Sequence, residues 1–392
     1  MRKPYGRNIT AVLCGCLMAG MIWNPISLAA ETGGPGTQLP NTEEKLVTMA
    51  GSPGFLYEDG MADKARFAGP MGMGVRDGMV MIADTGNNTV RCLYGRRVVT
   101  NAGKLLPRDF FGLTLGGYYD NFCPLALFNK PTDCLFDDRD RVIISDQKNH
   151  VLRMMFKGRV YTLAGDGTEG YQEGSKGGAR FSSPSGLAFG PDRCIYVADT
   201  GNNCIRKVDF LGHTTLVAGV PGQGGLCDGE AVEALFQEPM DVAVAADGTV
   251  YVADTGNQRV RMIRDGQVTT VAGSGQSGYQ GMDYCTPGYR DGDGRQAEFR
   301  FPRGICVAGD QVIVADTGNH RIRSIFPDGT VTTIAGSGEP GAEDGDPLEA
   351  TLLMPGDVEW ENGVLYIMDS GNSMIRRMKL AVEEEELAEE SR

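Results

Sequence analysis

The sequence predicts an all-β protein, a six-bladed β-propeller with four antiparallel strands in each blade. Three observations predict it. Sequence markers recur six times in one order, each repeat reads as four short strands, and the two ends of the chain carry complementary parts of one repeat. A ring of sheets suits such a chain because closure hides the sheet edges that an open array would expose.

Three markers define the repeat, and each recurs six times. The first is an Asp followed three residues later by Asn, with successive Asp residues 62, 53, 55, 62 and 53 positions apart. The second is Ala-x-Phe/Leu-x-x-Pro, and the third is Ala-Gly at the end of an apolar run. The six Asp–Asn pairs are Asp84–Asn87, Asp146–Asn149, Asp199–Asn202, Asp254–Asn257, Asp316–Asn319 and Asp369–Asn372.

Residues 239–273 show what one repeat builds. Apolar residues alternate with small or charged residues over 242–244, 250–252 and 260–262, and a fourth run spans 268–271. Asp-Gly and Gly-Asn pairs separate the runs, which is typical of short antiparallel strands joined by tight turns. No stretch within the repeats has a helical period.

The ends of the chain predict how the ring closes. An Ala-Gly run at residues 46–51 precedes any complete repeat, while the last repeat stops after its third strand, at residues 374–379. The N-terminal strand should therefore pair with the last strand and supply the missing outer strand of the final blade. An open array of hairpins does not explain such complementary ends.

The chain resembles the NHL-repeat family. The resemblance rests on Asp-Thr-Gly-Asn-His-Arg-Ile-Arg (316–323), on Tyr-Val-Ala-Asp-Thr-Gly-Asn (196–202 and 251–257) and on the Ala-Gly runs, and it covers roughly residues 45–380. It implies a six-bladed propeller that usually binds other molecules, without naming a ligand. Two repeats depart from the pattern: the second reads Asp146-Gln147-Lys148-Asn149, and the sixth ends its hairpin in Ser373-Met374.

We expect four segments: a signal peptide (1–29), a Gly/Pro-rich linker (30–44), the propeller (45–380) and an acidic tail (381–392). The expected signal peptide has basic residues, an apolar stretch and Ser27-Leu28-Ala29 as a cleavage site. This pattern favours export to the periplasm, the cell envelope or the medium of a bacterial-type cell. An uncleaved anchor and a lipid anchor at Leu13-Cys14-Gly15-Cys16 stay open.

Charge and cysteine content exclude some functions. The net charge is −14, and −17 without Arg2, Lys3 and Arg7. Such a surface repels nucleic acids and anionic lipids. Eight cysteines follow the leader, and their pairing is open because eight thiols allow 105 arrangements. A two-residue turn at Thr200-Gly201 would place Cys194 and Cys204 on opposite faces of one sheet.

Few residues suggest catalysis or metal binding. Following the strands puts the Asp-x-x-Asn turns and a second set of acids on one face, called the upper face. A ring of carboxylates could bind calcium. Because these residues recur in every repeat, we favour a structural role in which each Asp caps its own turn and pairs with the Arg seven residues later. The second set of acids is Asp59, Asp120, Glu173, Asp228, Asp291 and Asp344.

The three histidines do not predict a zinc site. His150 and His320 share one repeat position, where the NHL resemblance implies a packing role, and His213 falls in a turn on the lower face. No nucleophile elbow appears, and no cysteine lies beside a base in the sequence. We therefore predict no catalytic residue, no metal site and no cofactor.

The two longest connections break the six-fold symmetry. They enter repeats two and five, at about residues 104–127 and 274–298, and they are rich in aromatic residues. Aromatic side chains on long loops are typical of binding surfaces, but they also serve as loop packing, and both interpretations stay open. The candidate binding residues are Phe110, Phe111, Tyr118, Tyr119, Phe122, Tyr279, Tyr284 and Tyr289.

These observations favour an exported, monomeric binding or scaffold module over an enzyme. Its partner would be an extracytoplasmic protein, peptide or glycan bound by the upper-face loops. The alternative is a propeller enzyme of the lyase, lactonase or quinoprotein-dehydrogenase type, with a metal or cofactor in the central channel, although fold analogy alone is a weak argument for chemistry. A structural envelope component without a small ligand is a third hypothesis.

Overall fold

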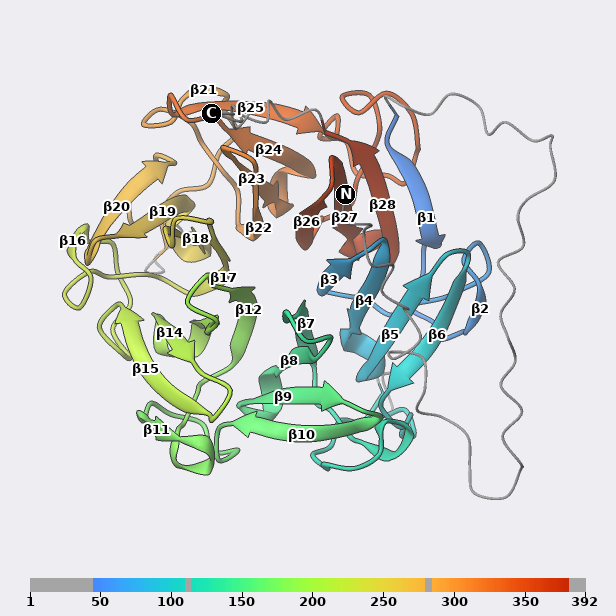
Figure 1. Cartoon of the computed structure of the whole chain (residues 1–392). Helices are drawn as coiled ribbons and strands as arrows, with labels where there is room; N and C mark the ends of the chain where they lie inside the picture. The colour runs from blue at the N-terminus through green and yellow to red at the C-terminus, as the bar shows by residue number, and fades with distance from the viewer. Residues whose placement is uncertain (1–44, 110–113, 279–283, 381–392) are drawn as a thin grey trace, which may run out of the picture.

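The computed structural model describes residues 45–109, 114–278 and 284–380, which form a six-bladed β-propeller (Figure 1). Six antiparallel sheets surround a central channel, so the predicted fold is confirmed. The predicted signal peptide, linker and acidic tail lie outside the described residues.

Each blade has four principal strands, which run in order from the channel to the outer edge. The inner strands are β3 (Gly72–Arg76), β7 (Pro131–Phe136), β12 (Pro184–Phe189), β17 (Pro239–Val244), β22 (Pro302–Ala308) and β26 (Asp357–Glu361). The second strands are β4 (Met79–Asp84), β8 (Val142–Asp146), β13 (Ile195–Asp199), β18 (Val250–Asp254), β23 (Gln311–Asp316) and β27 (Val364–Asp369).

The outer half of each blade is built in the same way. The third strands are β5 (Thr89–Tyr94), β9 (Val151–Phe156), β14 (Cys204–Val208), β19 (Arg259–Arg264), β24 (Arg321–Ile325) and β28 (Met374–Lys379). The outer strands are β6 (Arg97–Ala102), β10 (Arg159–Ala164), β15 (His213–Ala218), β20 (Gln267–Ala272), β25 (Thr330–Ala335) and, for the sixth blade, β1 (Val47–Gly51).

Two features were not predicted. Four blades carry a fifth strand of two residues on the outer edge: β2 (Gly60–Met61), β11 (Gly174–Ser175), β16 (Gly229–Glu230) and β21 (Gly292–Asp293). The upper turns are 3₁₀ turns: η1 (Thr85–Asn87), η3 (Gln147–Asn149), η5 (Thr200–Asn202), η6 (Thr255–Asn257), η8 (Thr317–Asn319) and η9 (Ser370–Asn372). Two further 3₁₀ turns are η2 (Cys123–Leu125) and η4 (Lys176–Gly178).

The predicted two-residue turn at Thr200-Gly201 is therefore wrong. Asp199 pairs directly with Cys204, so four residues connect the strands. The extra residues let Asn203 adopt a left-handed conformation, with φ at 53°. No helix in the described part of the chain is long and apolar enough to cross a membrane.

The ring closes as predicted. β1 pairs antiparallel with β28, with Val47 opposite Arg377 and Gly51 opposite Met374 (Figure 1). Leu46, next to β1, is completely buried in the cluster that joins the fifth and sixth blades. The first strand of the chain thus satisfies the backbone edge that the last blade would otherwise expose.

Apolar packing between neighbouring blades forms the core. One buried cluster, for example, combines Met81 of the first blade with Val142 and Ile144 of the second. The aromatic residue of the Ala-x-Phe marker is buried in five blades, as Phe67, Phe128, Phe181, Phe236 and Phe299. Because each cluster spans two sheets, no blade buries its apolar faces alone.

A hydrogen bond across each blade boundary joins the upper ends of neighbouring blades. The residue after each Asp-x-x-Asn turn has a φ of 53° to 56°, and its side chain accepts a backbone N–H from the next blade. His150 Nδ1 accepts from Ser183 N at 3.1 Å, and His320 Nδ1 accepts from Met354 N at 3.0 Å. Both histidines therefore join neighbouring blades as hydrogen-bond acceptors, a contact that the expected packing role did not include. The other acceptors are Asn88, Asn203, Gln258 and Ser373.

The recurring Asp and Arg pair in every blade, as predicted. In the first blade the completely buried Arg91 donates to Asp84 at 2.8 Å and to Asp59 at 2.6 Å. The expected local cap is wrong, because the second Asp84 oxygen accepts the backbone N–H of Ala68, sixteen residues earlier. Burial raises the pKa of Asp146 and Asp199, the equivalents of Asp84, to about 6, although the neighbouring Arg lowers both.

The third blade departs from this pattern. Glu173 replaces the outer Asp, and it accepts the backbone N–H of Leu216 at 2.7 Å but does not reach Arg206. Arg206 Nε is buried without a partner among the described residues, as is Arg376 Nε in the sixth blade, whereas Arg261 Nε donates to Asp228 at 3.1 Å. The longer side chain of Glu173 thus keeps the contact with the backbone of β15 but lacks the ionic contact with Arg206.

Removing β1 should open the ring. Deleting residues 1–51 should lower the melting temperature by at least about 5 °C, since burying Leu46 alone contributes about 2 kcal/mol and the β28 edge is also exposed. Thermal unfolding followed by circular dichroism measures this. The control is deletion of residues 1–44, and equal melting temperatures for the two deletions would contradict the closure.

Exchanging the outer acid of two blades should change stability in opposite directions. Glu173→Asp should raise the free energy of unfolding by about 1 kcal/mol, because it offers Arg206 Nε the acceptor that Asp gives the equivalent arginine in four other blades. Asp228→Glu should lower it by a similar amount. Urea unfolding compares the variants with the unchanged protein, and a Glu173→Asp protein that is not stabilised would refute this explanation.

Candidate functional site

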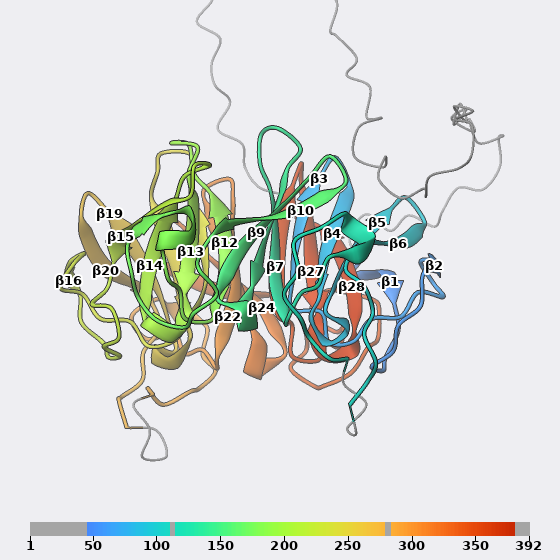
Figure 2. The ribbon, with the colours of Figure 1, turned by 90° about the horizontal axis from the view of Figure 1, so that it is seen from below.

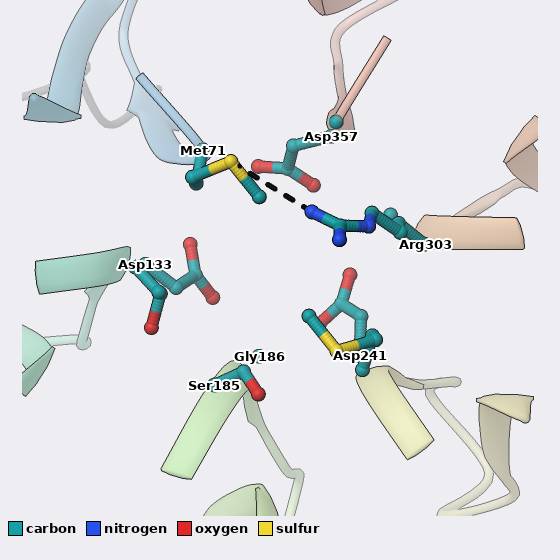
Figure 3. A pocket seen from close by; sticks show the side chains of 12 residues that line it. Met71, Asp133, Ser185, Gly186, Asp241, Arg303 and Asp357 are labelled. Atoms are coloured by element: carbon teal, nitrogen blue, oxygen red, sulfur yellow. Dashed lines mark hydrogen bonds between the residues drawn. The ribbon is translucent and has the colours of Figure 1, made fainter. Parts of the chain in front are cut away.

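The upper end of the channel contains a cavity of about 30 Å³, enough for a few water molecules or one small group. The inner strands begin there, so two successive residues at the start of each inner strand or just before it line the cavity (Figure 3). The first layer is Met71, Thr132, Ser185, Met240, Arg303 and Gly356. The second layer is Gly72, Asp133, Gly186, Asp241, Gly304 and Asp357.

Three aspartates in alternate blades form the second layer, which we call the Asp ring: Asp133, Asp241 and Asp357. Their relative exposure is only 6% to 9%. One oxygen of Asp241 accepts the N–H of the next residue at 2.7 Å, and the other accepts Ile305 N of the next blade at 2.9 Å. Asp133 and Asp357 each accept two backbone N–H groups in the same way. Each carboxyl group thus joins two inner strands.

Glycine alternates with aspartate in this layer because a side chain at the glycine position would overlap with the aspartate of the neighbouring blade. A Cβ at Gly186 would lie 1.9 Å from Asp241 Oδ1, and one at Gly72 would lie 2.6 Å from Asp133 Oδ1. The sequence analysis missed this ring, although its signal is visible in the sequence. The second residue after each repeat proline reads Gly72, Asp133, Gly186, Asp241, Gly304 and Asp357.

Burial and mutual repulsion favour the protonated form of these carboxyl groups. Burial raises the pKa of Asp357 to about 7. The pKa of Asp133 and that of Asp241 are raised well above the ordinary value by burial first and then by the neighbouring carboxylates. The pKa of Glu359, two residues after Asp357 on β26, is raised for the same reasons.

Arg303 breaks the symmetry of the first layer. Its guanidinium extends from the fifth blade toward the first blade, where Nη1 lies 3.8 Å from Met71 Sδ (Figure 3). No carboxylate oxygen of a described residue lies within 4.0 Å of its nitrogens. Burial lowers the pKa of Arg303, while the charge of Glu238 opposes that shift.

Two of the predicted aromatic residues lie over buried arginines. Tyr118 lies 5.0 Å from Arg153, and its hydroxyl bonds Thr162 at 2.7 Å. Tyr289 lies 5.0 Å from Arg323 and bonds Thr333 at 3.0 Å. Tyr57 and Tyr171 lie over Arg91 and Arg206 in the first and third blades. This repetition gives Tyr118 and Tyr289 a packing role in addition to any role in binding.

The other predicted residues are differently placed. Phe122 packs under Arg159 at 4.3 Å, and Tyr119 is 54% exposed. Tyr284 packs edge-on against Phe301. Burial, followed by a hydrogen bond to Glu238, raises its pKa to about 12. Phe110, Phe111 and Tyr279 lie outside the described residues.

Exposed apolar side chains do gather on the loops that enter the first two blades. Phe55, Leu56, Leu115 and Tyr119 have relative exposures of 63%, 55%, 48% and 54%. The two loops meet at Asn87, whose side chain donates to Leu56 O at 2.9 Å and accepts from Arg108 at 3.3 Å. We call these four side chains the rim patch. The chain segments that flank residues 110–113 and 279–283 leave the ring on the same face, at the bottom of Figure 2.

Histidines and cysteines do not form a further site. His213 begins β15 at the lower end of its blade and contacts Asp209 at 2.8 Å, far from the upper turns of His150 and His320. Six of the eight cysteines in the described ranges are buried. Within those ranges, no group of three His, Cys, Asp or Glu side chains is arranged to bind a metal ion.

The Asp ring should make stability depend on pH. The pKa of Asp357 is about 7 in the folded protein against an ordinary value of 3.8, so the folded state holds its proton longer than the unfolded chain does. The free energy of unfolding should therefore fall as pH rises between about 4 and 7, by up to about 1.4 kcal/mol per pH unit for each such group.

Asp357→Asn tests this dependence. The variant should lose part of the fall in stability that the unchanged protein shows between pH 5 and 8, as measured by urea unfolding at each pH. It should also be less stable throughout, because an amide offers one acceptor where the carboxyl offers two. Asp265→Asn, at a site 94% exposed, is the control. Parallel pH profiles for Asp357→Asn and the unchanged protein would contradict the protonated ring.

Comparison with known proteins agrees with the fold. A model of the NHL repeat matches residues 181–208, 236–261 and 299–323, in the third, fourth and fifth blades. The protein SUPPRESSOR OF QUENCHING 1 of Arabidopsis thaliana is 30% identical over 278 residues, which are 67% of this chain and 26% of that protein. The chain thus spans about a quarter of this relative's length.

Two solved structures share the architecture. A protein of unknown function from Bacteroides thetaiotaomicron has a TM-score of 0.62 at 20% identity, over 85% of this chain and 75% of that one. An auxiliary nutrient binding protein from Bacteroides ovatus has a TM-score of 0.60 at 16% identity, over 86% and 76%. At these identities the likeness concerns the fold. With its six blades, its closing first strand and the matched repeats, this chain is an NHL-repeat β-propeller.

Proposed function

We propose that this protein is an exported recognition or scaffold module that binds a protein, peptide or glycan through its upper-face loops. The rim patch is the observation that supports this most directly. It places four exposed apolar side chains on two neighbouring loops of an otherwise acidic protein. Exposed aromatic and aliphatic groups on loops held by a rigid ring are typical of interaction surfaces.

The channel supports an enzyme less well. A general acid or base needs an oxygen that can reach a substrate, but each carboxyl group of the Asp ring uses both oxygens for backbone N–H groups. The cavity of about 30 Å³ is also far smaller than typical substrate pockets, which hold some 300–1,000 Å³. The carboxylates of the upper-face turns are likewise paired with arginine.

The relatives are compatible with a binding role. The solved Bacteroides ovatus propeller is described as an auxiliary nutrient binding protein. Its likeness to this chain concerns the fold, so the proposal rests on the surface residues. Of the predicted aromatic residues, Tyr118 and Phe122 lie on the loop that enters the second blade, and Tyr284 and Tyr289 lie on the loop that enters the fifth blade. Phe110, Phe111 and Tyr279 stay predicted binding residues outside the described ranges.

Replacing the rim patch should abolish recognition. A protein with Phe55→Ser, Leu56→Ser, Leu115→Ser and Tyr119→Ser should bind any peptide or glycan selected from arrays at least about tenfold more weakly, because such residues carry most of the binding energy of an interface. Titration of each selected compound against both proteins measures the change.

Leu211→Ser is the matched control, since Leu211 is 72% exposed in a lower-face turn. It should leave binding unchanged, and both proteins should melt at the temperature of the unchanged chain. Binding that survives the fourfold change, or that is lost in Leu211→Ser, would refute an upper-face site. Arrays that yield no selective compound would refute the peptide and glycan partners.

A further inference from the structure

The upper end of the channel carries a second asymmetric feature, which is separate from the rim patch. At the position of Arg303, the other five blades have Met71, Thr132, Ser185, Met240 and Gly356. Arg303 is the single cation among these six equivalents. Residues that hold the ring together recur in every blade or in every second blade, whereas Arg303 occurs once and faces a cavity.

The surroundings of Arg303 do not use its hydrogen-bonding capacity. A guanidinium has five N–H donors in a planar fork, and the contact in the cavity is a thioether sulfur at 3.8 Å, which is a weak acceptor. The side chain is half-buried, and burial disfavours its charge. Donors that are partly desolvated in this way are satisfied best by an ionised oxygen acceptor.

We propose that Arg303 makes the upper end of the channel a binding site for a single carboxylate group, carried by the C-terminus of a peptide or by an acidic sugar. The planar fork matches a carboxylate, which can accept two parallel N–H bonds. The cavity of about 30 Å³ admits a group of this size, and the rest of such a ligand would extend over the upper face.

The Asp ring below Arg303 is compatible with an anion. Its carboxyl groups favour the protonated form, so they repel a ligand carboxylate much less than three ionised groups would. Glu238 helps to keep Arg303 charged. A single cation also suits the single charge of a carboxylate better than the double charge of a phosphate monoester.

Isothermal titration of the 392-residue chain with matched pairs of compounds tests this site. The first pair is Gly-Gly-Ala with a free C-terminus and with an amidated one, and the second is glucuronate and glucose. We expect at least one acid to bind saturably and at least about tenfold more tightly than its neutral partner, as a charge-assisted bidentate contact requires. The pair that responds identifies the source of the carboxylate.

Arg303→Met should reduce binding of that acid at least about tenfold, while Arg303→Lys should keep part of it. Arg264→Met, an equal loss of charge on the exposed lower face, should bind like the unchanged protein. All variants should melt normally, which separates a lost site from a lost fold.

Three outcomes would overturn the proposal: equal binding of acid and neutral partner, full binding by Arg303→Met, or no saturable binding of either acid at millimolar concentrations. The fourfold rim-patch variant should bind the acid normally. The two proposed surfaces can therefore fail independently.

Discussion

Hydrogen bonds across the blade boundaries are the constraint on which this ring depends. A blade cannot satisfy its own buried polar groups, so its neighbour supplies the acceptors. The residue after each upper turn accepts an N–H from the next blade, and in alternate blades the Asp ring does so again inside the channel. Each of these bonds joins two adjacent blades, and the pattern repeats around the ring. The bonds define the relative positions of the sheets, and the apolar core fills the space between them.

The same constraint explains the ends of the chain. If each blade needs its neighbour, a ring with a gap leaves two blades incomplete. β1 closes the gap by pairing with β28, and Ser373 and Asp357 of the sixth blade accept N–H groups of the first blade. Leu46 is buried beside that junction. The first residues of the ring thus depend on the last for both their hydrogen bonds and their apolar contacts.

Symmetry separates structural residues from candidate functional ones. The buried Arg–Asp pairs occur in all six blades, and the Asp ring occurs in every second blade, where glycine makes room for it. Arg303 and the rim patch occur once each, on the face where the entry loops lie. A ring of equivalent sheets can vary its loops and its channel end without changing the contacts that hold it together. Recognition on such a fold is therefore sought where the repeat is broken.

The sequence by itself determined the repeat, the fold, the closing strand and the pairing of Asp with Arg. Those properties depend on residue types at fixed spacings, which a repeated sequence displays six times. It did not reveal the position of Asp241 against Gly186, nor the reach of Arg303 to Met71, because these contacts join residues 55 and 232 positions apart. Only the curvature of the closed ring decides which of those side chains meet. The aromatic loops show the same division. Their composition is visible in the sequence, but only the structure shows that Tyr118 and Tyr289 pack over buried arginines.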